Sequence, residues 1–217
     1  MSEFRIEKDS MGEVKVPKDA YYGAQTQRAF DNFPVSKIRF SREFISALGR
    51  IKMVAAKVNE KLGHLDSNVA EAIQKAAKEV MEGEFDHDFV LDIFQTGSGT
   101  STNMNANEII AKRANELKTG TDVSIHPNDH VNMAQSTNDT FPTAMHVAIA
   151  LQTHKKLIPA LKKLEKSLEK KVNQFKDIVK IGRTHLQDAT PLTLGQEFSG
   201  YHEQVKNSLS RINIALK

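Results

Sequence analysis

The chain has 217 residues, of which 39% are hydrophobic and 26% charged, a balance typical of a globular protein large enough to bury a core. It contains no cysteine, which excludes disulfides, thiolate metal ligands and thiol nucleophiles, and a net charge of +3 is too small to indicate a nucleic-acid-binding protein. We find no apolar stretch of signal-peptide or membrane-span length, so we expect a cytoplasmic protein without a membrane or nucleic-acid partner.

The N-terminal segment predicts a small β-hairpin. Its strands would be Phe4–Glu7 and Glu13–Val16, and the residues between them, which include Gly12, favour a turn. Further along, Val90–Phe94 is a short apolar run that fits either a strand or a buried helix.

Helical periodicity dominates the rest of the first half. Between Ser41, a predicted N-cap, and Gly63, a predicted stop, apolar residues recur at steps of three and four. The same criteria predict helices over residues 67–83 and about 103–117. The apolar positions that we expect the first of these helices to bury are Phe44, Leu48, Ile51, Ala55, Val58 and Leu62.

The longest apolar pattern begins after Pro142 and keeps close to a 3.5-residue step as far as Val179. As one continuous helix it would be roughly 50 Å long, at about 1.5 Å per residue, although Pro159 should kink or interrupt it. Its many lysines, from Lys155 onward, alternate with glutamates and read as a solvated helix face. Such long helices pack in bundles, often between subunits, so we predict a mainly α protein.

Three segments interrupt this amphipathic pattern, because they are rich in hydroxyl groups, amides and glycine. The first box, Gln95–Asn105, lies directly before a helix, where free backbone N–H groups favour an anion. A simple capped turn explains it equally well. A dinucleotide-binding loop is disfavoured, because Gly97 and Gly99 lack the third glycine and no alternation of strands and helices follows.

The second box comprises His126–Asn132 and the following Gln135–Thr143, which leads into the long helix. His126 and His130 are four residues apart with Asp129 between them, a spacing that could hold a metal ion on a helix. However, the proline after His126 indicates the start or bend of a helix, and no H-E-x-x-H pattern is present. We therefore expect no metal here.

The third box, Gly182–Pro191, connects the long helix to a further helix that begins near its end. His185 could be an ordinary polar loop residue, but its neighbours Thr184, Gln187 and Asp188 favour a functional role, since polar sites collect at helix ends in bundles. Together the three boxes supply hydroxyl and amide donors with few fixed charges. That chemistry suits a small carboxylate.

At these boxes the sequence resembles the fumarase/aspartase superfamily, and class II fumarases most of all. The similarity covers essentially the whole chain, and its longest motifs are Val16–Thr26, Thr96–Thr100, Thr143–His146 and Gly182–Pro191. The resemblance implies an N-terminal mixed helical lyase domain, residues 1–138, followed by the first part of a truncated central long-helix bundle, residues 139–217. Family members are homotetramers built around such bundles.

The resemblance also implies a reaction and a set of site residues. The reaction is the reversible anti addition of water to fumarate, giving L-malate through an aci-carboxylate intermediate, with no metal and no other cofactor. His185 is the implied catalytic residue, oriented by an acidic partner. The implied substrate-binding residues are Ser98, Gly99, Thr100, Ser136, Thr137, Asn138 and Thr184. A secondary anion site would comprise His126, Pro127, Asn128 and Asp129.

Three features depart from the family pattern. The family's signature loop, which supplies a serine base, a lysine and an asparagine, would lie beyond residue 217, so we expect the 217-residue chain to be inactive alone. Val123 occupies a position where fumarases often have an arginine of the secondary site. Thr137 replaces a serine found in many fumarases, but it keeps the hydroxyl group.

Two alternatives to a fumarase remain. The first is aspartate ammonia-lyase of the same superfamily, which is disfavoured because aspartases usually carry glutamine at the position of His185 and a different wording at Thr96–Ser98. The second is a non-catalytic helical fragment that survives by self-association through the apolar seam of its long helix.

Overall fold

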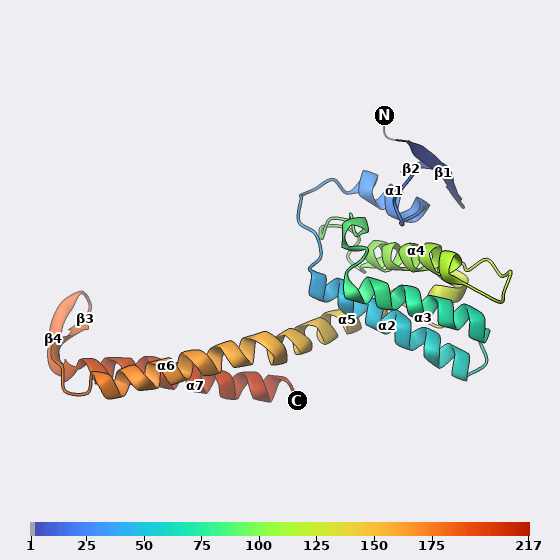
Figure 1. The fold of residues 1–217 in the computed structure, drawn as a ribbon. Coiled ribbons are helices and arrows are strands. Elements are labelled where there is room, and N and C mark those ends of the chain that lie inside the picture. The colour runs from blue at the N-terminus through green and yellow to red at the C-terminus, as the bar shows by residue number, and fades with distance from the viewer. Residues whose placement is uncertain (1–2) are drawn as a thin grey trace. The chain divides into compact units, whose positions relative to one another are not determined.

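A computed structural model describes residues 3–217 of the chain. Helices dominate it, which confirms the mainly α fold class (Figure 1). The chain divides into two compact units, the first ending at Ala148 and the second spanning Ile149–Lys217. The expected division into domains 1–138 and 139–217 stays a prediction. Within residues 3–217, no helix combines the length and the apolar character that a membrane span requires.

The first unit begins with the predicted hairpin. Strands β1 (Phe4–Asp9) and β2 (Gly12–Pro17) pair antiparallel, and both are longer than the sequence indicated. The Arg5 guanidinium ties the hairpin to the chain that follows it, because it donates to the carbonyls of Pro17, Ala20 and Tyr22 at 2.6–2.8 Å.

Four α-helices form most of the first unit, and their ends follow local capping chemistry. The side chain of Ser41 accepts from the backbone of Phe44 and starts α2, as predicted. Asp66, one residue before the expected start, caps α3, which stops at the left-handed Gly83. The helices are α1 (Ala24–Asn32), α2 (Arg42–Lys61), α3 (Ser67–Glu82) and α4 (Thr100–Leu117).

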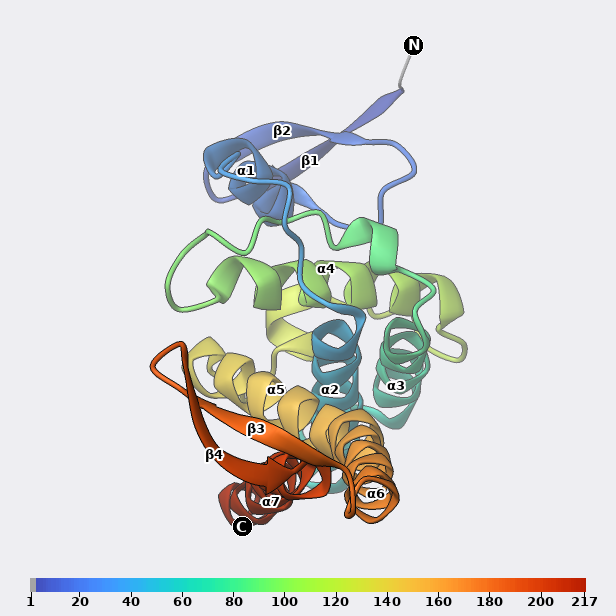
Figure 2. The same ribbon diagram turned by 90° about the vertical axis from the view of Figure 1, so that its left-hand side faces the viewer.

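Helices α2 and α3 lie side by side and enclose much of the core of this unit (Figures 1 and 2). Gly49 permits this approach, because a Cβ there would lie 2.9 Å from the carbonyl oxygen of Ala77 and the amide nitrogen of Met81. Leu48, Ile73 and the α4 residue Ile109 fill the space with fully buried side chains.

The buried face of α2 differs from the predicted one. Val58 and Leu62 are 46% and 64% exposed, whereas Lys52 and Asn59 are buried. A helix turns about 100° per residue, so a shift of one position along the sequence moves the buried stripe by more than a quarter turn. The exposed apolar residues line an open groove of about 510 Å³ between α2 and the residues from Met133 onward.

Between α3 and α4 the chain is mostly irregular. A short 3₁₀ turn, η1 (Asp86–Asp88), is followed by Val90–Phe94, which is neither the strand nor the buried helix that its apolar character suggested. Its backbone is fixed by side chains instead. The carboxylate of Asp92 accepts from the backbone amides of Ser36 and Phe94.

The long pattern predicted after Pro142 forms three consecutive helical elements. They are α5 (Thr137–Gln152), the π-helical turn η3 (Thr153–Leu157) and α6 (Ile158–Gln174). The interruption expected at Pro159 is therefore present, immediately before that residue. The helix was predicted to reach Val179, but it ends at Gln174, and Val179 begins a strand.

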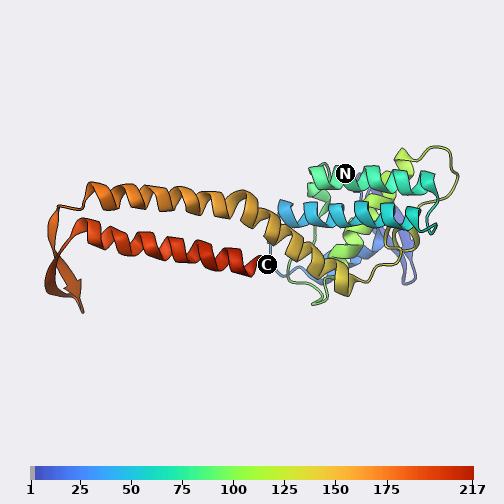
Figure 3. The same ribbon diagram turned by 90° about the horizontal axis from the view of Figure 1, so that it is seen from below.

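In the second unit, α6 packs against α7 (Leu194–Ala215) as an antiparallel helical hairpin (Figure 3). The two helices are joined by strands β3 (Val179–Thr184) and β4 (Gln187–Thr193), which pair antiparallel. The third box connects the long helix to the next one, as predicted, but it does so as part of a β-hairpin. Pro191, near which the next helix was predicted to begin, pairs with Ile181 inside the sheet, and α7 begins only after Thr193, whose side chain caps it.

Candidate functional site

The first box forms a tight turn that ends as the N-terminus of α4. The Gly99 amide donates to the Thr96 carbonyl at 3.0 Å, and Gly99 itself adopts a left-handed conformation with φ of +73°. The exposed hydroxyls of Ser98 and Thr100 lie 2.8 Å apart. Two hydroxyl groups therefore stand together at the positive end of a helix dipole, an arrangement suited to a carboxylate.

The second box forms a π-helical turn followed by the N-terminus of α5. The turn is η2 (Pro127–Val131), and the chain then reverses through Ala134, which has φ of +56°. The Ser136 hydroxyl accepts from the amide of Asn138 at 3.3 Å at the start of α5. Ser136 and Asn138 are exposed, so their side chains are accessible to a ligand.

The first and second boxes meet in the folded chain. The Asn103 side-chain amide, in the first turn of α4, donates to the Thr137 hydroxyl at 2.9 Å. Gly99 packs against the Phe141 ring so closely that a Cβ there would lie 2.3 Å from a ring carbon. The structure thus brings the starts of α4 and α5 together, with the hydroxyl and amide side chains predicted from both boxes.

A buried polar network that the sequence analysis missed lies beneath these two boxes. The side-chain oxygen of Asn132 accepts from Lys52 Nζ at 3.0 Å and from the amide nitrogens of Asn103 and Asn107 at 3.1 and 3.2 Å. Lys52 is 0% exposed, and burial lowers its pKa to about 7. One sequence signal could have revealed it, because Lys52 lies four residues after the core residue Leu48 on the same helix.

The third box lies in the second unit, at the tip of the β3–β4 hairpin. His185 and Leu186 both have positive φ, at 44° and 62°, and occupy the turn between the strands. The His185 ring is exposed, and its Nδ1 lies 3.4 Å from the Thr184 hydroxyl. Among the residues described, Thr184 rather than a carboxylate is thus next to His185, in contrast to the acidic partner that the resemblance implied.

The predicted secondary anion segment starts the π-helical turn. His126 Nδ1 accepts from the amides of Asn128 and Asp129 at 3.3 Å, and it lies 3.2 Å from an Asp129 carboxylate oxygen. The His126 amide in turn donates to His130 Nδ1 at 2.8 Å. Both histidines therefore use Nδ1 to cap the turn, and within residues 3–217 no cluster of three metal-ligating side chains is present.

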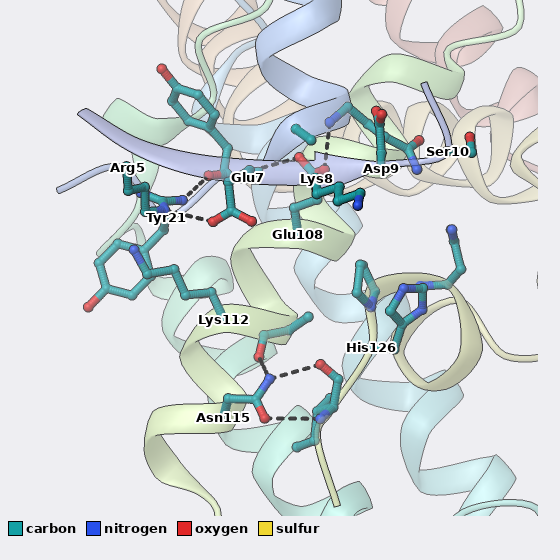
Figure 4. Close-up of a pocket in the computed structure, with 18 residues that line it drawn as sticks. Arg5, Glu7, Lys8, Asp9, Ser10, Tyr21, Glu108, Lys112, Asn115 and His126 are labelled. Atoms are coloured by element: carbon teal, nitrogen blue, oxygen red, sulfur yellow. Dashed lines mark hydrogen bonds and ion pairs between the residues drawn. The ribbon is translucent and has the colours of Figure 1, made fainter. Parts of the chain in front are cut away.

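A cavity of about 460 Å³ lies next to this segment, between the N-terminal hairpin, α4 and residues 125–128 (Figure 4). Asn115 holds its lower wall, because its side chain forms two hydrogen bonds of 2.8 and 2.9 Å with the backbone of Ile125 (Figure 4). The charged side chains of the wall are largely committed to the fold. Glu108 accepts from the amides of Gly23 and Thr26 at the start of α1, and Lys112 donates to a backbone carbonyl.

Comparison with known proteins places the chain in a family. Residues 12–217 match a family model described as lyase. The chain is 54% identical to the mitochondrial fumarate hydratase of Saccharomyces cerevisiae, over 100% of this chain and 45% of that protein. It is 55% identical to the class II fumarate hydratase of Halobacterium salinarum, over 98% and 46%.

A solved structure is also similar. The crystal structure of class II fumarase from Schistosoma mansoni matches with a TM-score of 0.92 and 46% identity, over 99% of this chain and 46% of that one. The chain thus spans a little less than half the length of these relatives. Since the family model covers nearly all of the sequence, the chain belongs to the lyase family, and its relatives within that family include class II fumarate hydratases.

Proposed function

We propose that the protein is a fumarate hydratase, which adds water reversibly to fumarate and gives L-malate. The observation that carries this proposal is the contact of the first and second boxes, where Asn103 joins the start of α4 to Thr137 at the start of α5. The similarity to fumarate hydratases along the whole chain supports the same reaction. These relatives do not favour the aspartate ammonia-lyase alternative.

In this proposal, neutral donors bind the two carboxylates of the substrate. Ser98, Thr100 and the α4 N-terminus contact one edge of the dicarboxylate, and Ser136, Thr137 and Asn138 contact it from α5. Hydroxyl and amide donors at two helix N-termini stabilise negative charge without a fixed cation. They can therefore also stabilise the additional charge that develops during the reaction.

The reaction requires that additional charge to be stabilised. In the direction from malate, a base removes the proton on the carbon next to one carboxylate, and the electron pair moves into that carboxylate to form an aci-carboxylate. The hydroxide on the neighbouring carbon then leaves with a proton as water, and the double bond forms. Preorganised donors aimed at such an oxyanion usually contribute the largest share of catalysis. We assign Thr184 and His185 to positioning and proton transfer at the reacting atoms.

We also propose that residues 126–129 bind a second anion beside the cavity of Figure 4. The side-chain amide of Asn128, which lines the cavity, would supply the donor, because the backbone amides of Asn128 and Asp129 already donate to His126. Val123 cannot contribute the charge that an arginine would bring at the same position, so we expect this binding to be weak.

The proposed assembly is a homotetramer. It is supported by apolar side chains of the second unit that are 44–67% exposed, namely Ile149, Leu157, Leu164 and Ile214. Exposed apolar surface of this extent on a helical hairpin is typical of a surface that packs against other helices.

The test is to incubate the intact protein that includes the signature loop, in EDTA, with fumarate, L-malate and L-aspartate and to follow the products by NMR, with the 217-residue chain as the control that is expected to be inactive. We expect fumarate and L-malate to interconvert, with one deuterium incorporated in deuterated water. Release of ammonia from L-aspartate would support the aspartase alternative instead. Absence of turnover, together with absence of dicarboxylate binding, would contradict the proposal.

A further inference from the structure

The side chain of Lys52 is fully buried, and both of its hydrogen-bond acceptors are amide oxygens. Among residues 3–217, no carboxylate forms an ion pair with it. Those acceptors are Asn132 at 3.0 Å and Gln135 at 2.9 Å. Burying an ammonium group with only neutral partners costs free energy that an apolar side chain would not cost. If Lys52 does more than fill the core, its role should follow from the contacts that its two acceptors, Asn132 and Gln135, make with the rest of the protein.

Asn132 and Gln135 are the first and last residues of the turn that joins the π-helical turn to α5. The Gln135 amide donates to the Asn132 carbonyl at 3.1 Å, and the Asn132 side chain donates to the Gln135 carbonyl at 3.0 Å. Asn59, two turns after Lys52 on α2, adds a third anchor by donating to the Met133 carbonyl at 3.1 Å. Helix α2 thus holds this turn from two positions on one face.

The contact continues from Asn132 to the proposed carboxylate site. The Asn103 side-chain nitrogen has two hydrogens, and it donates one to Asn132 at 3.1 Å and the other to the Thr137 hydroxyl at 2.9 Å. A hydroxyl that accepts from Asn103 has its own hydrogen free to point elsewhere. The ammonium form of Lys52 is a donor without acceptor capacity, so its contact keeps the Asn132 oxygen facing Asn103 and fixes this order of donors and acceptors.

We propose that Lys52 is a positioning residue, which holds the Asn132–Gln135 turn and, through Asn132 and Asn103, orients the Thr137 hydroxyl as a donor toward a bound carboxylate. The inference rests on the proposed function for the identity of that carboxylate. Lys52 makes the network rigid, which can be measured without a ligand. This rigidity improves dicarboxylate binding through Thr137, which can be measured separately.

The first measurement needs no ligand. In the intact protein, NMR of the side-chain amides of Asn103 and Asn132 is expected to show slow hydrogen exchange, which becomes at least about tenfold faster in Lys52→Met. The matched control is Ile73→Val, a fully buried position on α3 outside the network, which should leave these amides unchanged. Equal protection in Lys52→Met and the wild type would overturn the inference, whatever the dicarboxylate assays give.

The second measurement is a double-mutant cycle on KM and kcat with fumarate, in the intact protein that includes the signature loop. Lys52→Met and Thr137→Val are each expected to raise KM about tenfold with a smaller change in kcat, and the double variant should be no worse than Thr137→Val alone. Additive effects would show that Lys52 does not act through Thr137 and would overturn the inference. A wild type that binds no dicarboxylate would instead overturn the proposed function.

A second variant guards against misfolding of Lys52→Met. Asn103→Leu removes the group between Lys52 and Thr137 but keeps a similar volume, and the Asn132 oxygen retains its contacts with Lys52 and Asn107. It is expected to raise KM about as much as Thr137→Val. An unchanged KM in folded Asn103→Leu would overturn the inference as well.

Discussion

His185 shows how an exposed residue can still be held in a defined place. It occupies a two-residue turn with positive φ, and its ring is next to the Thr184 hydroxyl. The hairpin fixes the backbone, while the side chain remains accessible to a substrate. This combination suits a group that transfers protons, since such a group must be both positioned and reachable.

In the intact protein that includes the signature loop, we expect His185→Asn to lower kcat by about 100- to 10,000-fold with little change in KM, because proton transfer typically contributes that much. Steady-state kinetics with L-malate measures both parameters. The control is His202→Asn on α7, outside the three boxes, which should leave both unchanged. A normal kcat in His185→Asn would show that His185 is an ordinary polar loop residue without a catalytic role.

Lys52 should make the stability of the protein depend on pH in a specific direction. Burial lowers its pKa from 10.5 to about 7, so between these values the unfolded state binds more protons than the folded state. The free energy of unfolding should therefore rise with pH from about 7 upward, by at most about 1.4 kcal/mol per pH unit, and no further once pH exceeds the unfolded pKa.

Urea unfolding of the wild type and Lys52→Met at several pH values between about 7 and 9 tests this. The variant should lack the rise, so the difference between the two proteins should change with pH. If the two curves run parallel, the lysine is not the group responsible and its pKa is not lowered by burial.

At the scale of single elements, the first box depends on one glycine. Gly99 combines a φ of +73° with a distance of 2.3 Å between a hypothetical Cβ and the Phe141 ring. Gly97, two residues earlier in the same turn, has no atom within 4 Å of such a Cβ. The two positions therefore form a matched pair within one motif.

Gly99→Ala should destabilise the protein by about 2–4 kcal/mol, since both a left-handed alanine and overpacking against a ring are unfavourable. It should also weaken dicarboxylate binding, because α4 and α5 would be pushed apart. Gly97→Ala should change stability by less than about 0.5 kcal/mol. Chemical denaturation and titration with a dicarboxylate measure the two effects, and equal behaviour of both variants would contradict the assignment of Gly99.

The hairpin of the second unit provides a second element-scale test. Leu186 is 92% exposed and has φ of +62°, a conformation that favours glycine. Leu186→Gly should therefore stabilise the hairpin by about 0.5–1 kcal/mol, and Leu186→Ala, which keeps the strain, should not. Hydrogen exchange of the β3 and β4 amides distinguishes them. Faster exchange in Leu186→Gly would show that the leucine itself holds the turn.

The sequence predicted those elements whose signals are local. Ser41 and Gly83 mark helix ends through their own side-chain or backbone preferences, so α2 and α3 were located to within a residue or so. The β3–β4 hairpin was missed because its turn uses His185 and Leu186 where a glycine or asparagine is usual. The spacing of apolar residues in the preceding helix also continued into β3, so the sequence pattern did not show where the helix ends.

The candidate site divides in the same way. The residue types of the first and second boxes indicated a carboxylate site, but their contact through Asn103 and Thr137 depends on tertiary packing that no local pattern contains. Lys52 was missed for a related reason, since the apolar stripe chosen for α2 favoured Val58 and Leu62 over the face that is buried.

At the scale of the whole molecule, the second unit buries few of its side chains. A two-helix hairpin can bury only one side of each helix, and Ile158 is the one buried residue of α6. The apolar residues Leu157 and Leu164 are 44% and 46% exposed. Burying a large aliphatic side chain completely yields about 1.5–3 kcal/mol, so several such residues represent a large share of a domain's stability.

We therefore expect the protein to self-associate through α6 and α7. Sedimentation velocity over a range of concentrations should show a species larger than one chain, and Leu157→Ser combined with Leu164→Ser should shift it toward the monomer. Lys166→Ser, an exposed polar position on the same helix, is the control and should leave association unchanged. The self-association should change little with salt concentration, because it rests on apolar contacts and not on surface ion pairs. A compact monomer at all concentrations, with a sharp melting transition and no binding of a hydrophobic dye, would show that the exposed apolar residues need no partner.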